Sequence, residues 1–278
     1  MAVIGVDVGA TKIDVGLVRN KKLHRIISEP LNSKGTQSEV ISQIVGLIEK
    51  QLTKSVKAIG IGVPAIVENG VLFEAVNIKS WKKVNLKKIL EKKFHVPIFV
   101  NNDANCFTLG EKYFGKGNKQ SSVVGITLGT GFGGGIVTDG KLYNGNTGSA
   151  GEFGQILYLG KDVEYYCSGR YFEREYKKSG KELFELAKKG NRKALQAFSS
   201  FGAHIGKALS IVVNSVDPEI IILGGSISKS FPFFKSSMMK SLEPHVYNKS
   251  FSRLKVKQAK VKHVSVLGAA SLYYDSLQ

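Results

Sequence analysis

The fold of this chain is decided near its start, by Val3-Ile4-Gly5-Val6-Asp7-Val8-Gly9-Ala10-Thr11-Lys12-Ile13-Asp14-Val15-Gly16-Leu17-Val18. An apolar run ends at Asp7, and a short glycine-containing turn separates it from a second run in which apolar residues alternate. Two such runs joined by a tight turn predict adjacent antiparallel strands. Residues 23–27 predict a third strand after a turn at Asn20-Lys21. The chain is therefore expected to open with a three-stranded meander.

The residues that follow the meander alternate between helical and strand patterns. Apolar residues at helical spacing predict helices over 38–52, 84–94 and 104–114. Short apolar runs predict strands over 58–63 and 96–100. The first ~115 residues thus predict the order βββαβαβα, which is an α/β fold.

A similar order recurs in the second half. Strands at 122–128 and 135–137 flank a glycine-rich turn, and a long helix at 192–215 precedes a strand at 220–223. This repetition predicts two similar lobes, residues 1–115 with 263–278 and residues 116–262, with a nucleotide cleft between them. A short helix over 265–274 is expected to return to the first lobe.

Composition limits the class of protein. The 278 residues are 42% hydrophobic and include 15 Phe and 10 Tyr, enough apolar surface for a globular enzyme. Only two cysteines occur, Cys106 and Cys167, so a disulfide framework is not expected. With no leader-like start and no apolar run of 18 residues, the sequence predicts a soluble, cytoplasmic protein.

The charge balance is strongly basic, with 40 Lys and Arg against 22 Asp and Glu and a net charge of +18. Such a balance raises nucleic acid, an acidic membrane or polyphosphate as partners. The lysines are scattered in pairs such as Lys21-Lys22 and Lys87-Lys88, with no aromatic-interleaved stripe. A solvated basic surface is therefore the preferred interpretation, and neither a specific nucleic acid nor a membrane is expected as a partner.

Two turns have the composition of phosphate-binding loops. In the first turn, Gly9 lets backbone N–H groups approach a phosphate, and Thr11 and Lys12 add a donor and a cation. Asp7 would face magnesium through water. The second turn, Gly129-Thr130-Gly131, matches G-x-G-x-x-G with Gly134, but strand-forming residues follow where a dinucleotide-binding turn opens a helix. An ordinary hairpin is the alternative for the first turn.

Two carboxylates are further candidates for residues of the site. Asp103 follows a strand and opens a helix, where it could accept the proton of an attacking hydroxyl or merely cap the helix. Glu152 lies between glycines and could accept two hydrogen bonds from a sugar, with a structural turn as the alternative.

With these motifs in view, the sequence resembles the ROK family (repressor, open reading frame, kinase) of the actin, Hsp70 and hexokinase superfamily. The match covers nearly the whole chain. It rests on six motifs in the family's order, which are Asp7 to Lys12, Gly60-Ile61-Gly62-Val63-Pro64, Asn102-Asp103-Ala104-Asn105, Leu128-Gly129-Thr130-Gly131, Ala150-Gly151-Glu152-Phe153-Gly154 and Ile222-Leu223-Gly224-Gly225.

The resemblance implies a two-lobed, actin-like (ribonuclease H-like) ATPase fold that binds ATP with Mg²⁺ and a hexose in the interlobe cleft. It implies a sugar kinase acting on O6, usually a homodimer, with Asp103 as the base. The implied sugar ligands are Asn77, Asn102, Asp103, Glu152, Gln155 and Glu164. The implied ATP-binding residues are Asp7, Gly9, Thr11, Lys12, Gly129, Thr130, Gly131, Gly224 and Gly225.

The chain departs from the family in its sugar half. Gln155 stands where the family has a histidine, and residues 157–163 replace its zinc-binding cysteine cluster, so no structural zinc is expected. Glu164 is the preferred match to the family's later glutamate, with Glu173 as the alternative.

The sequence leaves the sugar acceptor and the phosphate donor open. Glucose, mannose, fructose and the N-acetylhexosamines are all compatible acceptors, and polyphosphate is an alternative donor. A sugar-responsive repressor is disfavoured because Asp7 lies six residues from Met1, which leaves no DNA-reading module before it. A non-catalytic sugar sensor is disfavoured because the phosphate and base residues are present.

Overall fold

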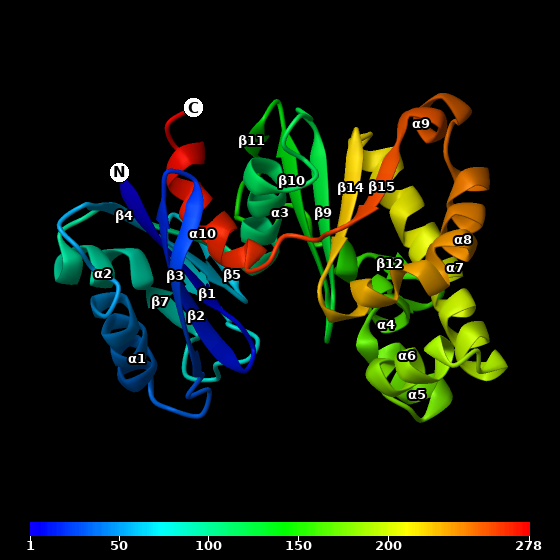
Figure 1. The fold of residues 1–278 in the computed structure, drawn as a ribbon, viewed down its shortest axis with the longest axis horizontal. Helices are drawn as coiled ribbons and strands as arrows, with labels where there is room; N and C mark the ends of the chain where they lie inside the picture. Colours follow the sequence, from blue (N-terminus) through cyan, green and yellow to red (C-terminus); the bar gives the residue numbers. More distant parts are fainter. The chain divides into compact units, whose positions relative to one another are not determined.

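The computed structural model describes all residues 1–278 and confirms an α/β fold with two five-stranded sheets. The chain divides into two compact units (Figure 1). Unit 1 holds residues 1–121, 135–150 and 260–278, and unit 2 holds residues 122–134 and 151–259. The lobes expected from the sequence differ from these units mainly in residues 135–150, which belong to unit 1.

The first sheet lies wholly in unit 1 and has the strand order β3-β2-β1-β4-β8. Its strands are β1 (Ala2–Val8), β2 (Lys12–Arg19), β3 (Lys22–Pro30), β4 (Val56–Val63) and β8 (Ile98–Asn102). Strands β1, β2 and β3 pair antiparallel, whereas β4 pairs in parallel with β1 and with β8. The predicted opening meander is confirmed.

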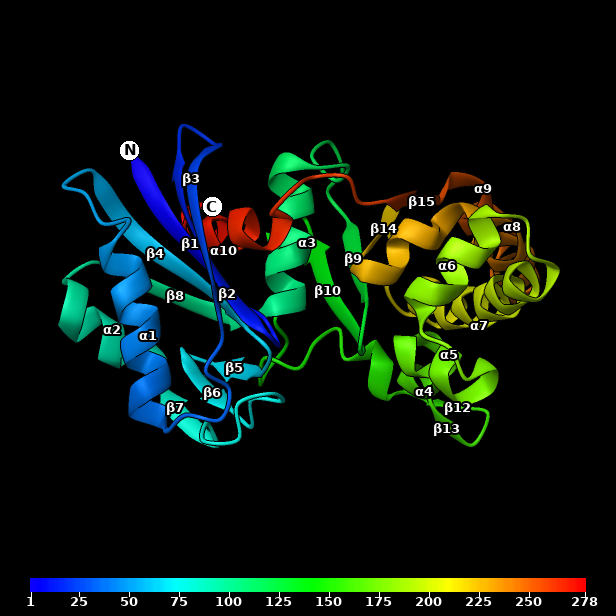
Figure 2. The same cartoon turned by 60° about the horizontal axis from the view of Figure 1, so that its bottom comes forward.

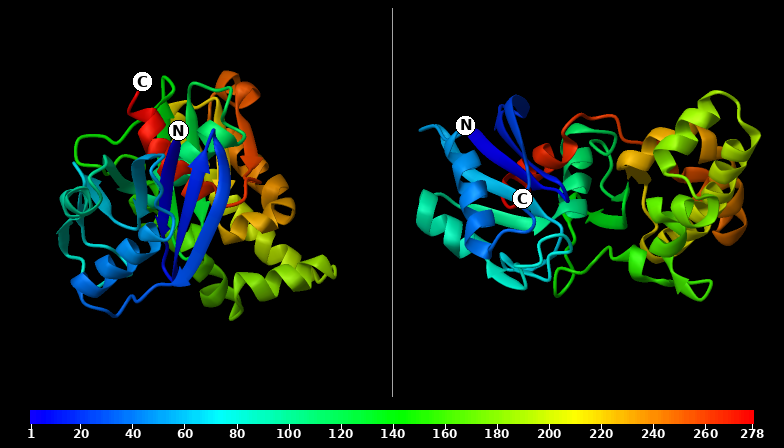
Figure 3. Two further views of the ribbon diagram at one scale, coloured as in Figure 1. Left: turned by 60° about the vertical axis from the view of Figure 1, so that its left-hand side comes forward. Right: turned by 90° about the horizontal axis from the view of Figure 1, so that it is seen from below.

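Helices cover both faces of this sheet. Helices α1 (Gln37–Glu49) and α2 (Leu86–Phe94) lie on one face, and α3 (Asp103–Phe114) and α10 (Val264–Asp275) lie on the other (Figures 2 and 3). Alternation along β1 explains this arrangement, because the even-numbered residues from Ala2 to Val8 join the core of α1 and α2, while Val3 joins that of α10.

Helix α10 approaches the sheet unusually closely because two strand residues lack side chains. A Cβ at Gly5 would overlap the carbonyl oxygen of Val266, and a Cβ at Gly60 would overlap that of Ala269. Glycine is therefore required at both positions. The expected return of the C-terminal helix to the first part of the chain is confirmed.

A small antiparallel sheet in unit 1 was not expected from the sequence. Its strands are β5 (Ile66–Glu68), β6 (Val71–Phe73) and β7 (Lys83–Asn85), in the order β5-β6-β7. Each strand has three residues, too few for an alternating pattern to stand out. Strand β7 also takes the residues at which α2 was expected to begin.

The second sheet repeats the connectivity of the first, with the order β11-β10-β9-β14-β15. Strands β9 (Val123–Leu128), β14 (Ile220–Gly224) and β15 (Lys255–Gln258) belong to unit 2 and pair in parallel. Strand β10 (Phe132–Thr138) carries the chain from unit 2 into unit 1, where it pairs with β11 (Lys141–Leu142). The predicted repeat of architecture is confirmed.

The helices of unit 2 pack around an aromatic core made by Phe172, Phe198, Phe201 and Phe234. The longest helix, α7 (Arg192–Val216), contacts α8 (Phe231–Leu242), and Gly202 and Gly206 let the two backbones approach. The remaining helices are α4 (Val163–Cys167), α5 (Gly169–Tyr176), α6 (Gly180–Lys188) and α9 (Asn248–Arg253). None of the helices is long and apolar enough to cross a membrane.

A two-stranded hairpin occupies the segment where the resemblance places a cysteine cluster in other family members. It consists of β12 (Leu157–Tyr158) and β13 (Lys161–Asp162). The Tyr158 hydroxyl lies 3.0 Å from Nδ1 of His204 on α7, and the Tyr166 ring stacks on His204 with centroids 5.0 Å apart. These aromatic contacts attach the hairpin to α7.

Candidate active site

In unit 1 the polar residues of the site lie at the ends of neighbouring strands. The antiparallel register of β1 and β2 places Asp7 opposite Asp14, and the parallel register places Asp7 beside Gly62 on β4. Strand β8 continues the row, with Asn101 beside Gly62 and Asn102 beside Val63. Strand pairing therefore brings the first phosphate motif and the Asn102-Asp103 motif to one edge of the sheet.

Asp7 lies in a surplus of negative charge. Burial raises the pKa of Asp7 to about 7, and the carboxylates of Asp103 and Asp14 add to this effect against the opposing charge of Lys12. A bound cation would relieve that repulsion. No group of three or more His, Cys, Asp or Glu side chains is placed to hold a metal by itself. One carboxylate nevertheless fits Mg²⁺, which commonly keeps waters and substrate phosphates among its ligands.

The start of α3 fixes the position of Asp103. The cap of the helix is Asn102, whose side-chain oxygen accepts hydrogen bonds from the N–H groups of Ala104 at 2.8 Å and Asn105 at 3.4 Å. Asp103 is the first residue of the helix, and its Oδ1 also accepts from the N–H of Ala104 at 2.9 Å, so Asn102 and not Asp103 occupies the cap position.

Gly62 leaves the space into which this helix start fits. A Cβ at Gly62 would lie 3.1 Å from Sγ of Cys106 and 3.6 Å from Cα of Asp103. Both Cys106 and Cys167 are buried free thiols, and burial is the first cause that raises each pKa above its usual range. Neither cysteine has the environment of a nucleophile.

The first phosphate turn is held mainly by its backbone. The N–H of Gly9 donates to the carbonyl of Lys12 at 2.9 Å, and the carbonyl of Thr11 accepts from Leu31 at 2.9 Å. The Lys12 ammonium donates to Asp14 at 2.6 Å. The sequence did not single out Asp14, which the register of β1 and β2 places opposite Asp7. Lys12 is therefore paired with a carboxylate, while its side chain stays 54% exposed.

Asn77 lies on an exposed loop of unit 1. The preceding N–H, that of Val76, donates to the carbonyl of Pro64 at 3.0 Å, which ties the loop to the end of β4. The Asn102 amide donates to the carbonyl of Ala65 at 3.3 Å. The same strand end thus anchors the segments that carry Asn77 and Asn102.

In unit 2 the second phosphate turn is closed by a hydrogen bond from the N–H of Gly129 to the carbonyl of Gly131 at 3.0 Å. The side chain of Glu164 supports this turn, because its Oε2 accepts from the N–H of Phe132 at 2.9 Å. A Cβ at Gly131 would lie 2.5 Å from the same oxygen. Glycine at this position therefore lets Glu164 reach the turn.

Glu152 and Gln155 lie at the two ends of a single 3-10 turn, where the N–H of Gln155 donates to the carbonyl of Glu152 at 3.1 Å. Burial, and then the charge of Glu164, raise the pKa of Glu152. Glu164 is thus near Glu152. Glu173 instead lies on α5 and lines a different cavity.

Two glycines at the end of β14 let two backbones meet. Gly224 pairs with Thr127 on β9, and Gly225 has a φ of +80°. A Cβ at Gly225 would overlap the carbonyl oxygen of Leu128. The two predicted ATP-side motifs, after β9 and after β14, are therefore in direct contact.

A cavity of ≈ 500 Å³ opens at this contact in unit 2. Its volume lies within the roughly 300–1,000 Å³ of small-molecule sites. Phe184 and Ile227 supply apolar surface to its wall, and the glycine turn contributes Gly129 and Thr130. Three cationic side chains line the cavity, Arg170, Lys181 and Lys229. An apolar wall beside cations and a glycine turn is suited to a nucleoside with phosphates.

Sequence reasoning missed most of this cavity. Arg170, Lys181, Phe184 and Lys229 come from three separate segments and form no local motif. The available signal was indirect, since Ser179 and Glu182 form the capping box of α6 and so place Lys181 in the first turn of that helix.

The chain is similar to known proteins over nearly its whole length. The model of the ROK family matches residues 3–276. N-acetyl-D-glucosamine kinase of Haemophilus influenzae is 32% identical over 273 residues, covering 87% of this chain and 89% of that protein. Glucokinase of Thermotoga maritima is 28% identical over 312 residues, covering 100% and 98%. The crystal structure of a ROK family glucokinase from Streptomyces griseus in complex with glucose and AMPPNP has a TM-score of 0.84 at 27% identity, covering 98% and 99%.

Proposed function

The chain belongs to the ROK family and is an ATP-dependent sugar kinase, and we propose that it transfers the γ-phosphate of ATP to O6 of a hexose. Glucose and N-acetylhexosamines are the first candidates, because the relatives described above include a glucokinase and an N-acetyl-D-glucosamine kinase. Unit 1 supplies the general base, and unit 2 supplies the nucleotide pocket.

Asp103 is the proposed base. Phosphoryl transfer to an alcohol needs a group that accepts the hydroxyl proton as the oxygen attacks the γ-phosphate. The Asn102 cap fixes the first turn of α3, and Asp103 sits in that turn. Asp103 accepts the proton, the oxygen–phosphorus bond forms, and ADP leaves with the electrons of the broken bond.

Each unit carries polar side chains that are proposed sugar ligands. Asn77 and Asn102 are the proposed sugar ligands of unit 1. Glu152, Gln155 and Glu164 are those of unit 2, and the closeness of Glu152 to Glu164 supports this grouping. Carboxylate and amide oxygens accept hydrogen bonds from sugar hydroxyls, and an amide at Gln155 adds a donor.

The nucleotide is proposed to bind in the unit 2 cavity, with its base against Phe184 and its phosphates at the Gly129–Gly131 turn. In unit 1, Gly9, Thr11 and Lys12 form the proposed second phosphate contact. A divalent cation, Mg²⁺ in the proposal, would bridge the phosphates, neutralise their charge and be held by Asp7 through water.

The observation that carries the proposal is the fixed place of Asp103 at the first position of α3. Its carboxylate is close enough to Asp7 to raise the pKa of that residue. The test is a coupled ADP-release assay over glucose, mannose, fructose, N-acetylglucosamine and N-acetylmannosamine. We expect turnover with at least one sugar, and a loss in kcat of about 10²–10⁴-fold for Asp103→Asn with sugar binding retained.

Asp217→Asn is the matched control, since it makes the same chemical change at an exposed helix cap in unit 2. It should leave kcat unchanged. Substantial activity in Asp103→Asn would show that another group is the base. Repeating the assay with polyphosphate tests the alternative donor, and faster turnover with polyphosphate than with ATP would contradict the proposed role of the nucleotide cavity.

A further inference from the structure

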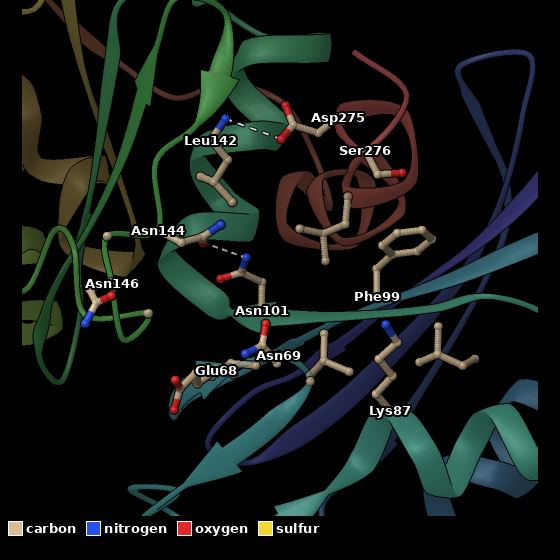
Figure 4. A pocket seen from close by; sticks show the side chains of 17 residues that line it. Glu68, Asn69, Lys87, Phe99, Asn101, Leu142, Asn144, Asn146, Asp275 and Ser276 are labelled. Carbon is tan, nitrogen blue, oxygen red and sulfur yellow. Dashed lines mark hydrogen bonds between the residues drawn. The ribbon is translucent and has the colours of Figure 1, made fainter.

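Unit 1 contains a cavity that none of the proposed catalytic or ligand-binding residues lines. Its volume is ≈ 470 Å³, within the roughly 300–1,000 Å³ of small-molecule sites. Its walls come from the β5–β6 hairpin, α2, β8, the segment after β11 and the end of α10 (Figure 4). Five separate parts of unit 1 therefore surround one space.

The lining is rich in groups that can hydrogen-bond to hydroxyls. Four asparagine side chains line the cavity, those of Asn69, Asn101, Asn144 and Asn146. Figure 4 shows them around the same space as Lys87, with Phe99 on one side. Amides both donate and accept hydrogen bonds, and an aromatic ring covers the C–H face of a sugar. This composition suits a polyhydroxylated molecule.

The charges of the lining favour a neutral molecule. Two carboxylates, Glu68 and Asp275, line the cavity with one ammonium, Lys87. A phosphorylated or carboxylated ligand would meet more like charge than opposite charge there. The Asp275 carboxylate also accepts from the N–H of Leu142 at 3.3 Å, which holds the segment after β11 against α10.

Lys87 is held in place by its surroundings. A Cβ at Gly70 would overlap the stem of the Lys87 side chain, and the Lys87 N–H donates to the carbonyl of Gly70 at 3.2 Å. The nearest carboxylate is Glu91, 4.0 Å from Nζ. The ammonium therefore keeps donors for a ligand while its stem loses little freedom on binding.

The cavity is linked to the catalytic strand end through Asn101. The Asn101 amide donates to Asn144 at 2.8 Å, while its oxygen accepts from the N–H of Asn102 at 2.8 Å and from the buried Asn105 amide at 2.9 Å. One side chain thus faces the cavity and fixes the peptide that leads into Asp103 (Figure 4).

We propose that this cavity is a second binding site, separate from the acceptor site, for a neutral monosaccharide or polyol. The asparagine amides and Lys87 bind its hydroxyls, and Phe99 covers its apolar face. Through Asn101 the occupied site contacts the start of α3.

The test is isothermal titration calorimetry without nucleotide, using glucose, N-acetylglucosamine and myo-inositol as neutral probes and glucose 6-phosphate as the anionic probe. At least one neutral probe should bind with two sites per chain. Lys87→Met should weaken the affinity of one site at least tenfold. Lys88→Met makes the same change on the neighbouring exposed residue of α2 and should leave the affinity of both sites unchanged. Glu152→Gln should weaken only the other.

Asn146→Ala provides a second variant on an exposed loop, where truncation leaves the packing of unit 1 intact. It should weaken the same site as Lys87→Met, and thermal melting checks that each variant is folded. The absence of any site that both Lys87→Met and Asn146→Ala weaken, or tighter binding of glucose 6-phosphate than of the neutral probes at this site, would overturn the proposal. None of these outcomes depends on ADP release, so a failed kinase assay leaves this test intact.

Discussion

Glu164 accepts a hydrogen bond from the backbone N–H of Phe132 at 2.9 Å, across 32 residues of sequence. The same carboxylate lies near Glu152 and 3.9 Å from the Arg170 guanidinium. One side chain therefore supports the second phosphate turn and stands next to the proposed sugar carboxylate.

Glu164→Gln is expected to separate these two roles. An amide oxygen can still accept from Phe132, so KM for ATP should change by less than about threefold. Loss of the charge should raise KM for the sugar by about tenfold, because hydrogen bonds to a carboxylate are roughly twice as strong as neutral ones. Glu164→Ala should raise both values. Steady-state kinetics measures each KM.

Glu173→Gln is the matched control for that change, and it should leave KM for the sugar unaltered because Glu173 lines the nucleotide cavity. If Glu173→Gln raised the sugar KM and Glu164→Gln did not, the register of the sugar motif would be wrong.

Phe184→Ala is expected to raise KM for ATP by about tenfold, equivalent to about 1.4 kcal/mol of lost binding, since the base would lose its apolar wall. Turnover with polyphosphate, which has no base, should be unaffected. Phe251→Ala truncates a comparable half-buried ring of unit 2 outside the cavity and should change neither value. An unchanged KM for ATP in Phe184→Ala would argue against nucleotide binding in this cavity.

Gly225→Ala is expected to lower the free energy of unfolding by more than the roughly 1–3 kcal/mol of left-handed backbone strain, because the new methyl also overlaps Leu128. Urea denaturation measures the loss. Gly190→Ala isolates the strain, since Gly190 has a φ of +76° with no atom within 4 Å of an added Cβ. Equal losses in the two variants would show that the contact with Leu128 contributes nothing.

The environment of His204 should make part of the free energy of unfolding depend on pH. Burial, and then the charge of Lys207, lower the pKa of His204, although Glu175 opposes this. Since the folded-state pKa lies below the unfolded value, the stabilisation is present above the unfolded pKa and is lost as pH falls through the folded one. Melting temperatures at pH 7.5 and 5.5 should therefore fall less for His204→Gln than for the unmodified protein.

His245→Gln is the control for this prediction, because His245 is exposed and lies outside the aromatic cluster. It should show the same fall in melting temperature as the unmodified protein. A fall in His204→Gln equal to that of the unmodified protein would exclude His204 as the source.

The sequence predicted those parts of the fold whose pattern is long or repeated. The meander of β1 to β3 and the 25-residue helix α7 bury a regular series of apolar side chains, so their periods are visible in the chain. The β5–β7 sheet was missed because three-residue strands show no period, and their pairing depends on contacts distant in sequence.

Prediction of the site was limited in the same way. Asp103 and the two phosphate turns lie in local motifs at strand ends, so the sequence showed them as candidates, and the family resemblance supplied their expected roles. The support that Glu164 gives to Phe132, the pairing of Lys12 with Asp14 and the cavity wall at Phe184 arise only when the strands and helices pack. The assignments of individual ligands, including Asn77 and Gln155, stay predictions.

The close contact of α10 with Gly5 and Gly60 also bears on how the chain is made. Strands β1 and β4, which α10 covers, are synthesised long before α10 itself. Until residues 264–275 have left the ribosome, Val3 and Ala58 lack the cover of α10. Unit 1 can therefore complete its core only after α10 has emerged, and a nascent chain stalled before Val264 would present an apolar sheet face to chaperones and proteases.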